Sequence, residues 1–228
     1  MVQFDPKLGL PSSDELPDSD GLPVDNELQT LVPNFLSLIL GFIWANRFDW
    51  FFGVNMGVYH TTGLNPRVPI VPDAFLSLGV ERVRGNNLRK SYVTWEENGV
   101  VPRFVLEVVS QTPGGEYDDK MTIYARLGVL YYVIYNPDFW RRDRQEPFEV
   151  YRLIDGIYQR QIREPFWMPE IGLGIGRGIG YHLGFQREWL YWFDQRGNRF
   201  PTPEEQAAEL RSMVERYRDR FGELPEAE

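Results

Sequence analysis

The sequence predicts an α/β fold with a mixed central β-sheet flanked by helices, and three observations support it. Segments 103–110 and 130–135 are nearly continuous apolar runs, as in strands that are buried on both faces. A helical segment, 116–127, lies between them, which is the order of a crossover that joins two parallel strands. Further strand-like segments and a charged helix follow, so we also expect a β-rich carboxyl-terminal part and a terminal helix.

The composition is that of one folded domain with extensions. The 228 residues are 43% hydrophobic and 15% aromatic, which is enough for a sizeable core. The absence of cysteine excludes disulfides and thiolate metal sites, and it fits a cytoplasmic protein. We see neither a secretory leader nor an apolar run long enough to span a membrane, so we expect no membrane partner. The net charge of −9 counts modestly against general nucleic-acid binding.

The amino-terminal half begins with a lead-in, residues 1–24, that is rich in Pro, Asp and Ser and predicts turns. Apolar residues then recur every three or four positions, which predicts a helix over 26–46 that begins or bends at Pro33. Strands are expected over 51–61 and 70–78, followed by a basic loop over 81–90 and a short edge strand over 92–95.

In the carboxyl-terminal half, Gly128 is expected to end the helix over 116–127 in a left-handed conformation. Segments 148–154 and 157–162 predict a hairpin around Asp155 and Gly156, and 181–185 and 189–193 are strand-like. The glycine-rich run 172–180 matches neither a dinucleotide nor a phosphate-loop motif, so a loop or hairpin is expected there. Thr202 and Glu205 form a capping box before a charged helix over 203–221. We therefore divide the chain into the lead-in 1–24, one domain over 25–195 and a charged tail over 196–228.

Two acidic residues interrupt apolar strands where a core is expected. Glu107 lies inside 103–110, and Asp73 lies inside 70–78. A buried carboxylate without a partner costs several kcal/mol or becomes protonated. Two such groups on neighbouring strands would repel each other unless a cation lay between them. The sequence therefore predicts a divalent metal site at one edge of the sheet.

Magnesium or manganese would suit this site, because both prefer oxygen ligands. The carboxylates of Asp73 and Glu107 and the main-chain carbonyl of Val108 could supply three of them. Lys120 would orient or deprotonate the attacking water, or balance charge in the transition state. The structural alternative is that Asp73 caps a turn and Glu107 pairs with Arg103 or Lys120, and the spacing alone does not decide between the two.

Several motifs taken together resemble the Uma-type restriction endonucleases, a family abundant in cyanobacteria within the PD-(D/E)XK nuclease superfamily. The resemblance covers about residues 20–160 and rests on segments 71–73, 104–110, 119–120, 124–129 and 131–137. It implies a restriction-endonuclease-like core with Asp73 and Glu107 as the metal ligands. The superfamily lysine expected two residues after the glutamate is replaced by Val109, and the resemblance implies that Lys120 supplies this function.

The resemblance also points to supporting residues around the site. Family members often carry a histidine in the first helix, where this chain has Gln29 with Glu27 close by. Ser110 and Tyr124 are further candidates for contacts that support the metal ligands.

A basic loop is the second candidate site. Arg82, Arg84, Arg89 and Lys90 could contact a phosphate backbone, since arginine matches phosphate oxygens well. The alternative is an ordinary solvated loop, which the spacing favours slightly.

We therefore expect a metal-dependent endonuclease, a hydrolase that cleaves phosphodiester bonds in DNA. The alternatives are a catalytically silent nuclease fold kept as a binding module and a hydrolase of small phosphate esters. A homodimer would suit cleavage of both strands of a duplex, although no single residue specifies one.

Overall fold

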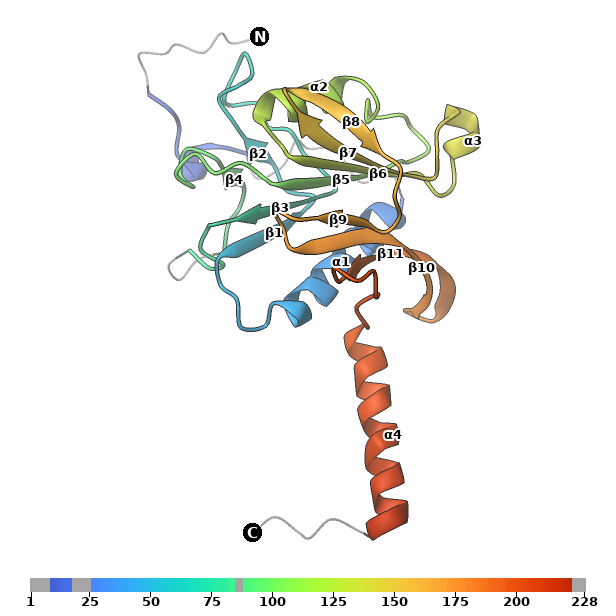
Figure 1. Ribbon diagram of the computed structural model, residues 1–228. Helices are drawn as coiled ribbons and strands as arrows, with labels where there is room; N and C mark the ends of the chain where they lie inside the picture. Colours follow the sequence, from blue (N-terminus) through green and yellow to red (C-terminus); the bar gives the residue numbers. More distant parts are fainter. Residues whose placement is uncertain (1–8, 18–25, 85–87, 223–228) are drawn as a thin grey trace.

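A six-stranded mixed sheet forms the centre of the computed structural model, which describes residues 9–17, 26–84 and 88–222 (Figure 1). Its strand order is β1-β3-β5-β6-β7-β8. β5 and β6 are parallel, and the other neighbouring strands are antiparallel. The strands are β1 (Trp50–Val54), β3 (Ala74–Leu78), β5 (Phe104–Val108), β6 (Tyr131–Tyr135), β7 (Phe148–Ile154) and β8 (Ile157–Gln161). The predicted α/β class with a mixed central sheet is confirmed.

Two helices cover opposite faces of this sheet. Helix α1 (Leu28–Ile43) packs on the face that carries Phe104, Leu106 and Val108 of β5. Helix α2 (Asp119–Leu127) packs on the other face, which carries Val105. Successive residues of a strand point to opposite faces, so Glu107 belongs to the face that α2 covers. The predicted crossover is confirmed, because α2 connects the parallel strands β5 and β6.

A second sheet lies on the α1 side and has the order β11-β10-β9 (Figure 1). Its strands are antiparallel and comprise β9 (Phe166–Met168), β10 (Leu173–His182) and β11 (Phe185–Phe193). The glycine-rich run is most of β10, so the expected hairpin is confirmed. A Cβ at Gly180 would overlap the Tyr191 hydroxyl, and one at Gly178 would lie 3.0 Å from the same ring. The alternating glycines therefore leave room for aromatic side chains of β11.

The strand predicted over 181–185 is wrong. Leu183 and Gly184 both have positive φ, 47° and 92°, and they form the turn between β10 and β11. Such a turn matches the twist of a hairpin. It was missed because only one of its two positive-φ residues is a glycine. The predicted hairpin around Asp155 and Gly156 is confirmed as β7 and β8, which pair up to Ile154 and Ile157.

A small third sheet pairs β2 (Val58–Tyr59) with β4 (Tyr92–Val93) in parallel. The single strand expected over 51–61 is therefore divided between β1 and β2, and residues 92–95 are not an edge of the central sheet. Part of the lead-in packs beside this third sheet, with a short 3-10 helix, η2, at Ser13–Glu15. The Trp95 indole N–H donates to the Pro11 carbonyl at 2.9 Å, and the Tyr59 hydroxyl donates to the Pro17 carbonyl at 2.7 Å. The rest of the lead-in, 1–8 and 18–24, lies outside the described residues.

Some predicted boundaries differ from those of the structure. The strand over 70–78 begins only at Ala74, so Asp73 lies just before β3. Helix α1 contains Pro33 and is shorter than the predicted 26–46, and α2 begins at Asp119 rather than at 116. Gly128 ends α2 with φ 88°, as expected.

Two further helices complete the fold. Helix α3 (Trp140–Asp143) follows β6. Helix α4 (Pro203–Phe221) projects away from the rest of the molecule (Figure 1). Its capping box is confirmed, since the Thr202 side chain accepts the Glu205 N–H and the Glu205 side chain accepts the Thr202 N–H. In the described part of the chain, no helix is long and apolar enough to span a membrane.

Candidate functional site

The structure brings Asp73, Glu107 and Lys120 together. Ala74 of β3 pairs with Leu106 of β5 in an antiparallel register, so Asp73 and Glu107 come from the same end of two adjacent strands. Both strands lie inside the sheet, and the two carboxylates lie where β3 begins and β5 ends. Lys120 reaches the pair from the first turn of α2.

Glu107 is held by two side chains of α2. The Lys120 ammonium lies 2.8 Å from Glu107 Oε2, and the Tyr124 hydroxyl donates to Oε1 at 2.5 Å. Lys120 and Tyr124 are four residues apart, which places them on one face of a helix. Glu107 is 1% exposed and Tyr124 is 1% exposed, so this network is inside the protein. The predicted alternative partner Arg103 does not form an ion pair with Glu107 in the described structure, whereas Lys120 does.

Asp73 is held differently. Its Oδ2 accepts the Val108 N–H at 2.6 Å, and the residue is 6% exposed. No lysine or arginine of the described residues forms an ion pair with Asp73. The N–H and C=O of a strand residue point to the same side, so the Val108 carbonyl faces the side of β5 on which Asp73 lies. The carboxylate is thus buried and hydrogen-bonded without a direct cationic partner.

This environment opposes negative charge on the two acids. Burial, followed by the charge of Glu107, raises the pKa of Asp73 to about 8. Burial also raises the pKa of Glu107, against the lowering effect of Lys120 and Tyr124. For Lys120, burial alone would lower the pKa, but Glu107 and then Asp73 outweigh it and raise the pKa. The site therefore holds more negative charge than its one lysine stabilises.

Glu116 is a nearby acidic residue that the sequence reasoning missed. It is 5% exposed, and its carboxylate oxygens accept the Gly114 N–H at 3.0 and 3.2 Å. Its charge raises the pKa of Asp73 and of Glu107. The sequence places Glu116 directly after a Pro-Gly-Gly turn, and we expected only a helix start there. The sequence carries no local signal of its place beside the two carboxylates, which only the folded structure shows.

The predicted supporting residues differ in how closely they are connected to Asp73 and Glu107. Gln29, in the first turn of α1, connects to the site through Asn55: the Gln29 carbonyl accepts the Asn55 side chain at 3.5 Å, and the Asn55 N–H donates to the Asp73 carbonyl at 3.1 Å. Glu27 precedes α1 and is exposed. Ser110 is 2% exposed, and its hydroxyl donates to the Thr112 carbonyl at 2.8 Å.

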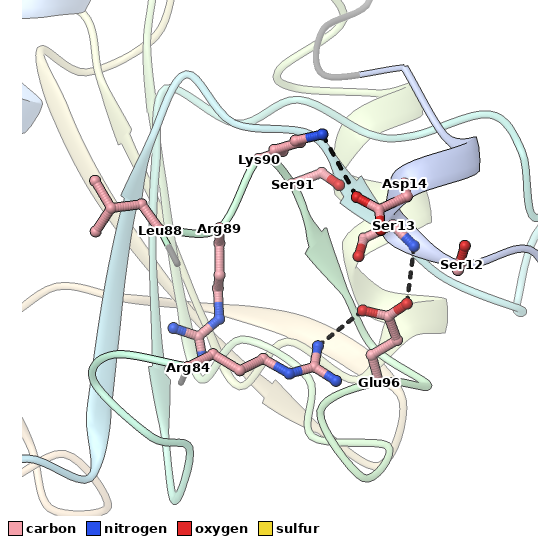
Figure 2. Close-up of a pocket in the computed structure, with 9 residues that line it drawn as sticks. All are labelled: Ser12, Ser13, Asp14, Arg84, Leu88, Arg89, Lys90, Ser91 and Glu96. Atoms are coloured by element: carbon pink, nitrogen blue, oxygen red, sulfur yellow. Dashed lines mark hydrogen bonds and ion pairs between the residues drawn. The ribbon is translucent and has the colours of Figure 1, made fainter. Parts of the chain in front are cut away.

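The basic loop lies elsewhere, beside a polar cavity of about 630 Å³ that Ser12 and Ser13 also line (Figure 2). Of its cations, Arg84, Arg89 and Lys90 have acidic partners. Arg84 pairs with Glu96 at 2.8 Å, as Figure 2 shows, and Lys90 lies 3.4 Å from Asp14. Residues 85–87 lie outside the described residues.

Arg82 and Arg89 of this loop pack against aromatic rings. The Arg82 guanidinium lies 4.5 Å from the Trp50 ring, and that of Arg89 lies 4.5 Å from the Phe51 ring. The Arg89 side chain is only 4% exposed and pairs with Glu97 at 2.8 Å. Arg89 is therefore part of the folded structure and does not belong to a solvated loop.

The donors at the site suit a hard divalent cation. Among the described residues, no group of three His, Cys, Asp or Glu side chains is placed to hold a metal ion. A cation bound by Asp73 and Glu107 would therefore need main-chain, water or substrate oxygens as well, which is how magnesium usually binds. Asp73 and Glu107 are buried oxygen donors, and no lysine or arginine of the described residues pairs with Asp73, so the donor set is compatible with such an ion.

Comparison with known proteins gives one match. A family model with the description "Uma2: Putative restriction endonuclease" matches residues 22–180, which is more than half of the 228 residues. No curated protein and no solved structure was found to match the chain.

Proposed function

The chain belongs to the Uma2 family, which is described as 'Putative restriction endonuclease', and we propose that it is a metal-dependent endonuclease that hydrolyses phosphodiester bonds in DNA. The family match supports a nuclease. The observation that carries the finer proposal is the pair of buried carboxylates, Asp73 and Glu107, at one end of β3 and β5 with a lysine beside them.

Asp73, Glu107 and the Val108 carbonyl are the groups that would hold magnesium or manganese. When bound, the ion would polarise a phosphoryl oxygen and increase the acidity of a coordinated water. Tyr124 would fix the orientation of Glu107, since its hydroxyl bonds one carboxylate oxygen and leaves the other to Lys120. A ligand whose rotamer is held in this way loses little entropy when it binds.

Lys120 would act mainly as a cation. Its pKa is raised, so the ammonium stays protonated at neutral pH and is a poor base. Its side chain is 25% exposed, while its ammonium bonds the buried Glu107. A protonated lysine in this position would orient the attacking water and stabilise the negative charge that develops on the phosphoryl group.

Cleavage of supercoiled plasmid DNA with added Mg²⁺ or Mn²⁺ tests the proposal. We expect the parent protein to nick or linearise the plasmid, and Asp73→Asn, Glu107→Gln and Lys120→Met to lose at least about a hundredfold in rate. Asp138→Asn, which changes an exposed carboxylate, serves as the control and should keep the parent rate. A folded parent that cleaves no DNA with either metal would contradict the proposal. Hydrolysis of a small phosphate ester without DNA cleavage would instead support the ester hydrolase.

A further inference from the structure

Helix α4 carries an apolar stripe with coiled-coil spacing. Along its 19 residues, apolar side chains recur at alternating intervals of three and four, the pattern of the a and d positions of a heptad. The stripe consists of Ala207, Leu210, Val214, Tyr217 and Phe221. Met213 lies beside it. A repeat of 3.5 residues suits packing along another helix, whereas a helix on a globular core usually shows a wider stripe.

Ala207 is partly buried, and beyond it the described part of the protein leaves this stripe uncovered. Every residue from 208 to 222 is exposed, and Leu210 and Phe221 are 59% and 63% exposed. Figure 1 shows α4 extending away from the sheets, so a second helix could lie along it. Most of the stability of a helix in a protein comes from packing of its apolar face, so covering the stripe would stabilise α4.

The charges of α4 indicate what would cover the stripe. Its first turn is acidic, with Glu204 and Glu205, and its last turn is basic, with Arg218 and Arg220. Two copies aligned in parallel would place like charges together at both ends. Two antiparallel copies would place the acidic turn of each beside the basic turn of the other, which is favourable.

We propose that α4 is a dimerisation helix, and that two copies of the chain pair through antiparallel α4 stripes. In this register the a and d positions face each other, so Leu210 packs on the second copy's Val214 and Ala207 packs on the second copy's Tyr217. The dipoles of the two helices also point in opposite directions in this arrangement, which is favourable. This dimer does not depend on the nuclease proposal, since it uses no residue of the candidate site.

Sedimentation equilibrium of the full chain tests whether the α4 stripe holds two copies together. The parent should be a dimer that dissociates on dilution, and Leu210→Glu/Val214→Glu should be a monomer, because two buried carboxylates would face apolar side chains. Ala208→Glu/Ser212→Glu adds the same charge on the outer face of α4, at positions that point away from the stripe, and should remain a dimer. A monomeric parent, or a dimer that survives Leu210→Glu/Val214→Glu, would overturn the proposal.

Disulfide cross-linking tests the orientation of the two helices. The chain contains no native cysteine, so only the introduced cysteines can react. Under mild oxidation, Ala207→Cys/Tyr217→Cys should form a covalent dimer, while Ala207→Cys and Tyr217→Cys alone should not. Rapid cross-linking of both single variants would show a parallel pair and contradict the antiparallel arrangement. All three variants change only partly or fully exposed residues of α4, so the fold of the two sheets should be unaffected.

Discussion

Replacing Asp73 by Asn should stabilise the metal-free protein, and the gain should grow with pH. The pKa of Asp73 is about 8 in the folded protein and 3.8 ordinarily. Below about pH 4 the carboxyl is protonated in both states, so it makes no difference to stability. Between these values the unfolded chain releases the proton while the folded protein keeps it, so the free energy of unfolding falls by about 1.36 kcal/mol per pH unit.

The full effect, reached above about pH 8, is on the order of 5 kcal/mol, because the pKa rises by roughly four. Asn carries no charge and can still accept the Val108 N–H, so Asp73→Asn removes the cost and keeps the hydrogen bond. Most substitutions at a buried hydrogen-bonded site destabilise, which makes a gain diagnostic.

Urea unfolding of parent and Asp73→Asn at about pH 5 and about pH 9, with a chelator present, measures this difference. We expect a stabilisation of about 1 to 2 kcal/mol at the lower pH, which lies only about one unit above 3.8, and of several kcal/mol at the higher pH. Glu107→Gln is the matched comparison and should destabilise, because it leaves Lys120 without its carboxylate. The reasoning is refuted if Asp73→Asn destabilises at the higher pH or if its effect does not depend on pH.

Four further substitutions test other parts of the structure. Lys120→Met leaves the buried Glu107 without its cation, so urea unfolding should show a loss of about 1 to 3 kcal/mol; an unchanged midpoint would mean that the ion pair contributes nothing. Tyr124→Phe removes the hydroxyl donor to Glu107 and should cost about 1 to 3 kcal/mol in the same assay, whereas a neutral effect would show the carboxylate is satisfied otherwise. Gly180→Ala collides with the tyrosine ring across the hairpin and should destabilise by about 1 to 3 kcal/mol. Gly41→Ala, at an exposed helical position with open space, should stabilise by roughly 0.5 to 1 kcal/mol, and equal effects of the two alanines would contradict the packing argument.

The central sheet could be predicted because its strands are visible as apolar runs in the sequence. The apolar runs of β5 and β6 and the helix between them define a parallel crossover without any other information. Glu107 and Asp73 could be identified for the same reason, since a carboxylate is conspicuous inside an apolar run. Their position at one end of neighbouring strands followed once the strands were placed side by side.

The remaining features depend on contacts between distant segments. The pairing of β2 with β4 involves strands of two residues each, which are too short to show a period. The glycine-rich run forms a strand because Tyr191 and its neighbours fill the space above it, and nothing local to 172–180 indicates those rings. Glu116 was missed because only the folded structure shows its place beside the two carboxylates. The sequence shows Arg89 only as one cation of a basic loop, and only the tertiary structure brings Glu97 and Phe51 to it.

Metal-linked stabilisation tests the central claim, that Asp73 and Glu107 hold a divalent cation, most directly. Thermal or urea unfolding of the parent is measured near pH 8 with increasing Mg²⁺ or Mn²⁺, with and without duplex DNA, beside Asp73→Asn. The account predicts that the parent gains about 2.7 kcal/mol at a metal concentration one hundred times the dissociation constant, and that Asp73→Asn gains nothing. A parent that gains no stability from either metal in the presence of DNA, or an equal gain in Asp73→Asn, would contradict it.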